Sequence, residues 1–465
     1  MKTYQDLLEV GENEIDRAKF CKTAVEQFRG SREYAEAVAG EAYYHKHNLT
    51  IEGFQKFLYT LSGRKVPDLF SANYRLKTVF FRRLVQQQVQ YVLGNGVILQ
   101  NPSNKKKLGA DFDKKMVDAA KTAMASGRAF GFWNYDHLEV FGYADTQGEP
   151  GFCPLYSKEN SKLMAGIRFW FEVIGDKEIF RATLYEVDGL TEYRQIGSDD
   201  PEVLKEKSAY KHRISRTEAD GIQEVIGENY TDLPIVCLYA NDSKESELIG
   251  HREVIDCYDF IKSGFANNID DFDGLFWLVK NAGGMEDTDL SKFLYRLKTV
   301  HAAVVDGDDG ATAESAKNEV PTEARKAMLE ILRADLYEDF QSLDVKTLSA
   351  AAKTTQEIQA AYQNMDNKCA DFEYLLIDFV QKILELAGIK DNPTFLWNKV
   401  LNMREQTEMV LAAANYLTPE VIVKHLPFLT PEEADQVIKD KNLEAYNNAH
   451  AFDDEEEEDE DDSNR

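Results

Sequence analysis

One apolar pattern, between residues 354 and 388, limits most strongly what this chain can fold into. Large apolar residues recur there at alternating spacings of four and three, which is the repeat of one helix face. A helix of about 34 residues is about 50 Å long, so it must pack against other elements over many turns. The residues of this stripe, called the seam below, are Ile358, Tyr362, Met365, Cys369, Phe372, Leu376, Phe379, Ile383 and Leu386. The seam predicts a long helix over 354–388, ended by Gly388, that packs against other helices.

Alternating apolar and polar residues over 127–216 predict an antiparallel β-meander. Turn sequences such as GEPG and GDK separate the expected strands. A helix over 111–127 precedes the strands, and another is expected over 73–94, beginning at the capping residue Asn73. With short helices before them, these elements predict an α+β domain over residues 1–240.

Two long helices with a small insert between them are expected after residue 240. Asp242 followed by Glu245 resembles a capping box and predicts a helix over 241–272. Pro321 suits the first turn of a second helix over 321–342. The insert, 273–320, predicts a small α/β unit. Its expected elements are a strand at 275–281, a helix at 287–299, a second strand at 301–305 and a loop at 307–319.

A small, polar and weakly cationic stretch over 343–353 interrupts the helical pattern before the seam. Its centre reads VKTLSAAAK, with two lysines and no acid. After the seam, short helices are expected over 389–452, where Thr418-Pro419-Glu420 is one start signal. The acidic run that begins at Asp453 is expected to be disordered.

The composition indicates a chain that folds and carries a strong negative charge. It has 465 residues, 43% of them apolar, and a formal net charge of -28. Residues 1–452 keep 53 basic and 72 acidic residues, a net charge of -19. Broad binding to nucleic acid is therefore not expected, because lysine and arginine supply most of that affinity. We expect no membrane span, no signal peptide and, from five scattered cysteines, no disulfide framework, so a reducing cytoplasm fits.

Familiar catalytic motifs are absent from the sequence, which contains no GxxxxGK[ST], GxSxG, HExxH or GxGxxG. Residues 306–310 read DGDDG like the start of a calcium loop, yet Lys317 stands at the twelfth position, where a glutamate is needed. Two aspartate clusters could hold a divalent metal for phosphodiester hydrolysis, although acidic turns explain them as well. They are Asp270, Asp271 and Asp273, and Asp306, Asp308 and Asp309. We expect no enzyme activity, no metal and no cofactor.

The order of these parts resembles the portal proteins of tailed bacteriophages, particularly those of long-tailed phages of Gram-positive hosts. The resemblance spans residues from about 70 to 450 and includes NYRLKTVFFRRLVQQQVQYVLGNGVIL near its start and YLTPEVIVKHLPFLTPEEADQVIKDK near its end. It implies an α+β, mostly helical fold with portal-type architecture. The implied parts are a wing (1–240), stem helices (241–272 and 321–342), a clip (273–320), a tunnel loop (343–353), a long helix (354–388), a helical crown (389–452) and a disordered acidic tail (453–465).

A portal resemblance implies a ring, usually of twelve subunits, at one capsid vertex, around the channel through which the genome enters and leaves. The protein would assemble in the host cytoplasm and reside in the virion, with no membrane contact. Its implied partners are other copies of itself, the terminase large subunit, a head completion or adaptor protein, the scaffold and major capsid proteins, and double-stranded DNA transiently in the channel. The clip residues expected to meet partners are Lys280, Asp287, Lys292, Arg296 and Lys298.

The resemblance also implies that the tunnel loop reaches into the channel. The residues expected to face DNA are Val345, Lys346, Thr347, Leu348, Ser349, Ala350 and Lys353. A loop beside a moving polyanion should carry few cations, because each tight lysine–phosphate contact slows release. Family members often have Ser-Gly before the long helix, whereas Ala350 follows Ser349 here, so the register of the loop stays open by a few residues.

Other readings of the sequence stay open. The chain could be a metal-dependent phage nuclease that uses the aspartate clusters. It could also be a structural adaptor or scaffold that dimerises through the seam. The polar stretch could be an ordinary connection between helices.

Overall fold

The computed structural model describes residues 1–59, 63–68, 71–146, 148–216, 223–270, 275–280, 292, 295, 312–317, 321–346, 355–398, 407, 410–426, 429 and 433–441. The chain forms two compact units, Met1–Trp397 and Asn398–Arg465. Described elements of the second unit include η3 (Ala413–Asn415) and α14 (Pro419–Lys424), and residues 433–441 are helical as well. As predicted, α14 begins directly after Thr418, with Pro419 at its first position.

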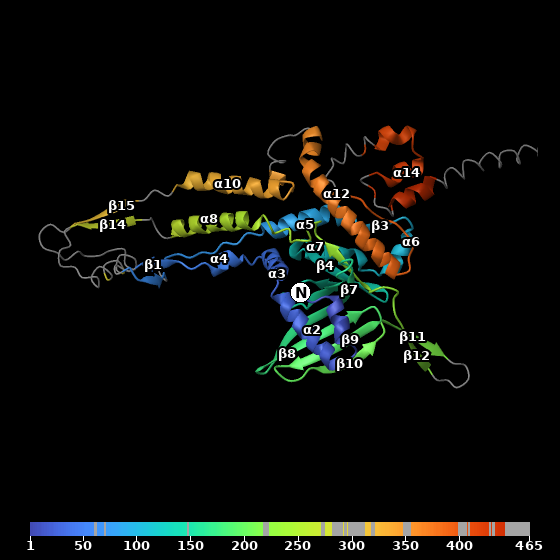
Figure 1. Cartoon of the computed structure of the whole chain (residues 1–465). Helices are drawn as coiled ribbons and strands as arrows, with labels where there is room; N and C mark the ends of the chain where they lie inside the picture. The colour runs from blue at the N-terminus through green and yellow to red at the C-terminus, as the bar shows by residue number, and fades with distance from the viewer. Residues whose placement is uncertain are drawn as a thin grey trace, which may run out of the picture. The chain divides into compact units, whose positions relative to one another are not determined.

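Helices precede and surround the sheet of the first unit (Figure 1). They are α1 (Tyr4–Val10), α2 (Glu14–Arg29), α3 (Arg32–Tyr44), α4 (Leu49–Gly53), α5 (Phe80–Leu93), α6 (Pro102–Lys105), η1 (Lys106–Leu108) and α7 (Phe112–Ser126). Short strands β1 (Phe57–Tyr59) and β2 (Lys65–Pro67) pair with each other. The helix predicted over 111–127 is confirmed, since α7 ends at Gly127, whose φ of 86° is the left-handed conformation that glycine accepts easily.

An eight-stranded sheet follows, in the order β10-β9-β8-β7-β6-β5-β4-β13. Its strands are β4 (Arg128–Asn134), β5 (His137–Gly142), β6 (Gly151–Tyr156), β7 (Leu163–Ile174), β8 (Lys177–Glu186), β9 (Gly189–Ile196), β10 (Glu202–Ser208) and β13 (Ile235–Tyr239). All neighbours pair antiparallel except β5 and β6, which meet in parallel at Gly142 and Gly151. The predicted antiparallel meander is confirmed from β6 to β10 and for the pair β4–β5, whereas the parallel contact of β5 with β6 was not predicted. A separate hairpin is formed by β11 (Lys211–Arg216) and β12 (Gln223–Glu228).

Strand β4, which lies next to the edge strand β13, is buried on both faces. Phe130 and Phe132 belong to a core shared with α1 and α2, whereas Ala129 and Trp133 belong to a second core shared with α5, α7 and α12 (Thr355–Leu386). At Gly131 an added Cβ would lie 2.5 Å from the ring of Phe379, so only glycine lets this helix approach the sheet so closely. At the end formed by β13, β4 and β5 the sheet is therefore a middle layer between two sets of helices, and this mixture of helices and sheet confirms an α+β fold.

The seam prediction is confirmed for the helix and for the buried face. α12 covers Thr355–Leu386, and the described seam residues from Tyr362 to Ile383 are all buried. The expected partners are only partly right. α12 packs against α5 but also against the strands β4, β13 and β16 (Pro393–Phe395), because an apolar stripe fits a sheet face as well as a helix.

The pair of long helices is present as α8 (Arg252–Asp270) and α10 (Thr322–Asp339), which lie side by side (Figure 1). The predicted start of the first helix is wrong. Residues 241–251 form turns, because the side chain of Asn241 accepts a hydrogen bond from the Glu245 N–H at 3.2 Å and donates to Glu247 at 2.8 Å. The capping-box pattern at Asp242 and Glu245 therefore belongs to the turns before α8 and does not mark the start of the helix.

The predicted start of α5 is also wrong. The helix begins at Phe80, and residues 73–79 before it are not helical. Their backbone N–H groups donate to side chains of α8, as described below. Contacts with a distant helix thus override the local helical pattern.

The insert between α8 and α10 differs from the expectation in its second strand. β14 (Leu275–Lys280) pairs antiparallel with β15 (Thr312–Lys317), a segment that was predicted to be a loop. The strand expected at 301–305 and most of the helix expected at 287–299 lie outside the described residues. In the region predicted as helical crown, β16 is a strand that pairs with β3 (Val97–Leu99). The tail 453–465 also lies outside the described residues.

Candidate functional site: the connection between α10 and α12

The chain leaves α10 in a direction defined by buried contacts. Phe340, the residue after the helix, is fully buried, and its ring centre lies 6.5 Å from that of Phe81 and 5.0 Å from that of His251. Gln341 follows with a φ of 54°, a left-handed conformation that turns the chain out of the helix. The end of α10 is thus held by α5 and by the turn before α8.

The next residues are held by hydrogen bonds and by an ion pair. Arg333 on α10 binds both carboxylate oxygens of Asp344, at 2.8 and 2.7 Å. Asp344 also accepts the backbone N–H of Lys346 at 3.0 Å, and Gln87 on α5 donates to the carbonyl of Leu343 at 2.9 Å. Bidentate arginine–carboxylate pairs fix geometry well. The connection is therefore held as far as residue 344.

α12 is tied to the same place from the other side. The ammonium of Lys368 donates to the Phe340 carbonyl at 3.1 Å, lies 3.6 Å from the centre of the Phe340 ring and pairs with Glu247 at 2.6 Å. Tyr362, closer to the start of α12, stacks on Tyr91 of α5 at 5.8 Å between ring centres. Both sides of the connection therefore rest on α5.

Two of the predicted loop residues lie in the described part of the chain. Val345 is 63% exposed, and Lys346 is exposed as well; both are helical in conformation and directly follow the held residue Asp344. The other predicted residues, Thr347, Leu348, Ser349, Ala350 and Lys353, lie outside the described residues. The structure thus provides the base of the predicted loop and its first two exposed residues.

The predicted clip residues are not brought together as one described cluster. Lys280 is the last residue of β14, where it pairs with Thr312 of β15. Lys292 is helical and exposed. Asp287, Arg296 and Lys298 lie outside the described residues. Their role in partner binding stays a prediction.

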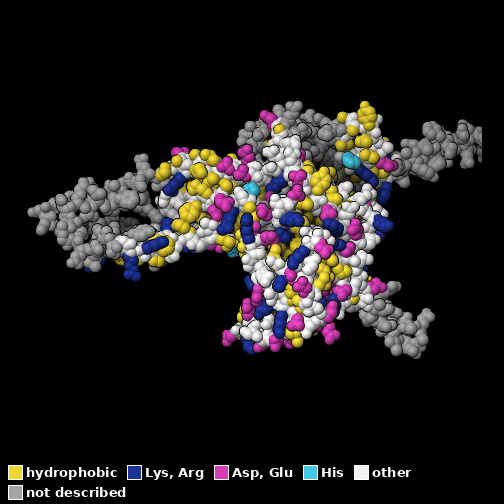
Figure 2. Space-filling model, in the orientation of Figure 1, with side chains coloured by type: hydrophobic (Ala, Val, Ile, Leu, Met, Phe, Trp, Pro, Cys, Tyr) yellow, Lys and Arg dark blue, Asp and Glu magenta, His cyan; other side chains and the backbone are white. Residues whose placement is uncertain are grey.

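The paired helices α8 and α10 keep large apolar side chains at the surface. Phe260 and Ile269 on α8 are 43% and 69% exposed, and Met328 and Ile331 on α10 are 40% and 53% exposed. Figure 2 shows hydrophobic side chains gathered over these two helices. Such a surface on one chain is typical of contact with another protein surface.

One functional arrangement escaped the sequence analysis: polar residues of α8 bind an extended segment. Asp259, Ser263 and Asn267 accept the backbone N–H groups of Thr78, Leu76 and Tyr74, at 3.0, 2.9 and 2.6 Å. Four residues of helix rise by about 6 Å, close to the rise of two residues of extended chain. Polar residues at every fourth position of a helix were the only available signal, and this spacing is equally typical of a solvated face.

The sequence-predicted aspartate clusters fall almost wholly outside the described residues. Asp270 ends α8, whereas Asp271, Asp273, Asp306, Asp308 and Asp309 lie beyond the described ranges. Among the residues that the structure describes, no three His, Cys, Asp or Glu side chains are placed to bind a metal ion. Within the same residues, no helix combines the length and the apolar character that crossing a bilayer requires.

The first unit thus combines a pair of long helices, a connection held at its base and a long helix packed on a mixed sheet. The sequence of residues 32–446 matches the family described as phage portal protein, SPP1 Gp6-like. The chain therefore belongs to this family of phage portal proteins, and it is a phage portal subunit. Forming a ring channel for genome packaging is the general function of the family, whose members are structural components of the virion rather than enzymes.

Two known proteins resemble the chain over most of its length. The portal protein of Clostridium phage phiCD119 is 24% identical over 429 residues, which cover 87% of this chain and 92% of that protein. The portal protein of Bacillus phage SPP1 is 23% identical over 446 residues, which cover 90% of this chain and 86% of that protein. The resemblance noted in the sequence is thus confirmed, and the nuclease and adaptor alternatives lose their support.

Proposed function

We propose that copies of this chain form a closed ring, usually of twelve, and that residues 345–353 line the narrow part of its channel. The observation that carries this placement is the connection between α10 and α12, which is held on both sides up to Asp344 and then exposes Val345. A loop that starts from a fixed base projects in a defined direction. Twelve such loops would meet around one axis.

The proposal assigns the other parts by their position in the chain. Residues 1–240 form the wing, the helices within 241–272 and 321–342 form the stem, and residues 273–320 form the clip. The exposed apolar residues of α8 and α10 support contact between neighbouring stems, since ring formation would bury them. The clip would meet the terminase large subunit and later a head completion protein, through Lys280, Asp287, Lys292, Arg296 and Lys298.

The charge of the chain suits a channel that DNA passes through without being held. With 82 acidic and 54 basic residues, each copy repels a polyanion overall. Only Lys346 and Lys353 bring positive charge to the proposed loop. Few lysine–phosphate contacts keep the binding weak, so DNA can slide in both directions. ATP hydrolysis would be supplied by the terminase.

Native mass spectrometry of the purified full chain tests the ring. We expect closed assemblies of about twelve copies. Images of the same particles should show a central hole next to the start of α12. Single subunits or pairs under every condition would contradict the proposal. Dimerisation through the seam is not supported, because the described seam residues from Tyr362 to Ile383 are buried within the chain itself.

A further inference from the structure

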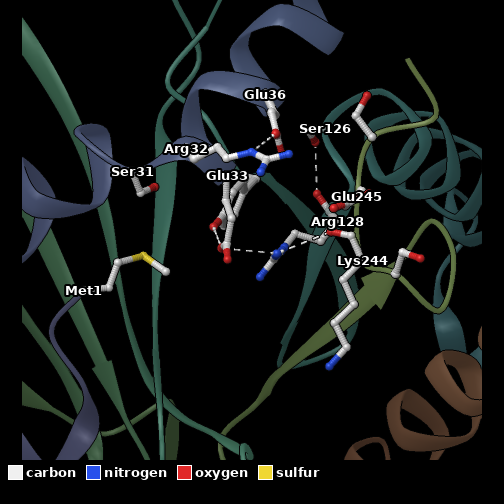
Figure 3. Close-up of a pocket in the computed structure, with 12 residues that line it drawn as sticks. Met1, Ser31, Arg32, Glu33, Glu36, Ser126, Arg128, Lys244 and Glu245 are labelled. Carbon is white, nitrogen blue, oxygen red and sulfur yellow. Dashed lines mark hydrogen bonds and ion pairs between the residues drawn. The ribbon is translucent and has the colours of Figure 1, made fainter. Parts of the chain in front are cut away.

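A small polar cavity lies between the start of α3, the junction of α7 with β4, and the turn after β13 (Figure 3). Its volume is about 290 Å³, at the lower end of the range for ligand pockets, so it has room for a side-chain group rather than a nucleotide. Below it is called the Arg128 pocket. Its central residues are Arg32, Glu33, Arg128, Tyr143 and Lys244.

Arg128 is buried in this pocket, and the ion pair that it forms there, with Glu33, is long. The residue is 7% exposed. Its Nη2 lies 3.5 Å from Glu33 Oε2 and 3.4 Å from the Lys244 carbonyl, both long contacts for a charged donor. Its Nε is buried and has no hydrogen-bond partner among the described residues. Because a guanidinium offers five N–H donors, most of them are free to bind another group.

The surroundings hold this guanidinium toward the cavity. Its carbon lies 4.6 Å from the ring centre of Tyr143 and 5.8 Å from that of Tyr239. Figure 3 shows the group pointing between Glu33 and Lys244. The two aromatic rings thus position a side chain that lines the cavity, although its Nε is not accessible from there. A buried charge with only a long ion pair is unfavourable in the isolated chain.

The acids around the pocket favour a ligand with one negative charge over a ligand with two. Arg32 is paired with Glu36 at 2.5 Å, and Glu33 accepts the Tyr143 hydroxyl at 3.2 Å. Burial raises the pKa of Tyr143, so its hydroxyl keeps its proton and remains a donor. The charged side chains of the lining are three acids and three cations: Glu33, Glu36 and Glu245 against Arg32, Arg128 and Lys244. A phosphate group or a DNA strand would therefore bring more negative charge than the pocket can balance.

We propose that the Arg128 pocket binds one carboxylate, the side chain of an aspartate or glutamate from a second copy of this chain. This inference rests on the proposed ring. A neighbouring copy is present in every assembled ring, and each copy has 82 acidic residues, so a carboxylate is available at any contact between copies. A planar carboxylate binds a guanidinium through two parallel hydrogen bonds, which completes the site.

The test compares assembly of the full chain with that of two charge-reversal variants. Lys244→Glu places a negative charge at the exposed mouth of the pocket, and Lys177→Glu makes the same change at an exposed position on β8. Native mass spectrometry measures the protein concentration at which half of the chains are in closed assemblies. We expect Lys244→Glu to raise this concentration about tenfold or more, and Lys177→Glu to change it less than about twofold.

A competition experiment identifies the group. Sodium acetate should raise the half-assembly concentration of the unmodified chain relative to sodium chloride of the same ionic strength, and it should have less effect on Lys244→Glu. If inorganic phosphate competes and acetate does not, the carboxylate assignment is wrong. If both variants assemble like the unmodified chain, the pocket has no role between copies, although the ring stands. If the unmodified chain forms no closed assembly, the proposed function fails together with this inference.

Discussion

At the scale of single residues, Asp259 decides how α8 is attached to the rest of the chain. Its side chain is fully buried, and its two oxygens accept the Thr78 N–H at 3.0 Å and the Asn48 amide at 2.9 Å. Burial raises the pKa of Asp259. The helix therefore depends on a polar residue whose removal leaves the Thr78 N–H and the buried Asn48 amide without this acceptor.

Replacing this residue should lower stability by a measurable amount. We expect Asp259→Ala to reduce the free energy of unfolding by about 2 to 3 kcal/mol, because the Thr78 N–H and the Asn48 amide lose their acceptor. Glu253→Ala, at an exposed position of the same helix, should cost less than about 0.5 kcal/mol. Urea unfolding followed by circular dichroism measures both. Similar values for the two variants would disprove the role given to Asp259.

Glu41 on α3 should make stability depend on pH. Burial raises the pKa of Glu41 from its ordinary value of 4.5 to about 7, and burial also lowers the pKa of His45, which lies 3.6 Å away. Below pH 4.5 the carboxyl is protonated in both states, so its full contribution is present. Between pH 4.5 and 7 unfolding releases its proton, so stability falls as the pH rises.

The variant Glu41→Gln isolates this effect. At pH 8 we expect it to be more stable than the unmodified chain by up to about 3 kcal/mol, and at pH 4 the difference should vanish. Thermal unfolding at a series of pH values measures the difference. A constant difference from pH 4 to pH 8 would mean that Glu41 does not titrate as inferred.

At the scale of elements, α12 is stabilised by a stripe that is buried along its length. Phe372 is 2% exposed, whereas Tyr374, two residues further on, is 73% exposed. Phe372→Ala should lower the free energy of unfolding by about 3 to 5 kcal/mol, and Tyr374→Ala should change it by less than about 1 kcal/mol. Chemical denaturation gives both values. A large effect of Tyr374→Ala on unfolding of single chains would contradict the burial pattern.

Other elements show why local patterns predict some boundaries and miss others. α7 ends at Gly127, as predicted, because the left-handed conformation that ends a helix depends only on the residue at that position. α5 starts seven residues later than its pattern suggests, at Phe80, because residues 73–79 are bound to α8. β15 formed in a segment predicted as a loop, because Thr312–Lys317 found a partner in β14. The start of α5 and the formation of β15 therefore both depend on contacts between segments that are distant in the sequence.

At the scale of the whole molecule, the proposed loop should be needed for the passage of DNA through the channel and not for assembly of the ring. Deleting Thr347–Ala351 should leave rings intact, because the contacts of Asp344 and Lys368 that hold the base lie outside the deletion. Packaging of DNA into capsids should fall sharply. Native mass spectrometry checks the ring and DNA protection from nuclease checks packaging. If the deletion variant packages DNA at normal yield, the proposal that this loop faces DNA in the channel is wrong.

The candidate site was only partly predictable. The polar stretch at 343–353 stood out because it breaks a helical pattern, and the structure describes its base and two exposed residues, Val345 and Lys346. The residues that hold this base were not predictable, since Gln87 and Leu343 lie 256 positions apart in the chain. Arg128 likewise gave no signal, because a single arginine in a β-strand is ordinary until its burial is known.

Periodicity along the chain was enough to establish the long helix, its buried face, the meander and the glycine that ends α7, because each depends on neighbours within a few residues. Which surfaces those elements meet depended on the folded chain. The seam lies on a sheet as well as on a helix, α8 binds the backbone of residues 73–79, and Arg128 faces a cavity, because these contacts join segments that the sequence keeps far apart. Such long-range contacts form only when the whole chain has folded, so local sequence patterns do not predict them.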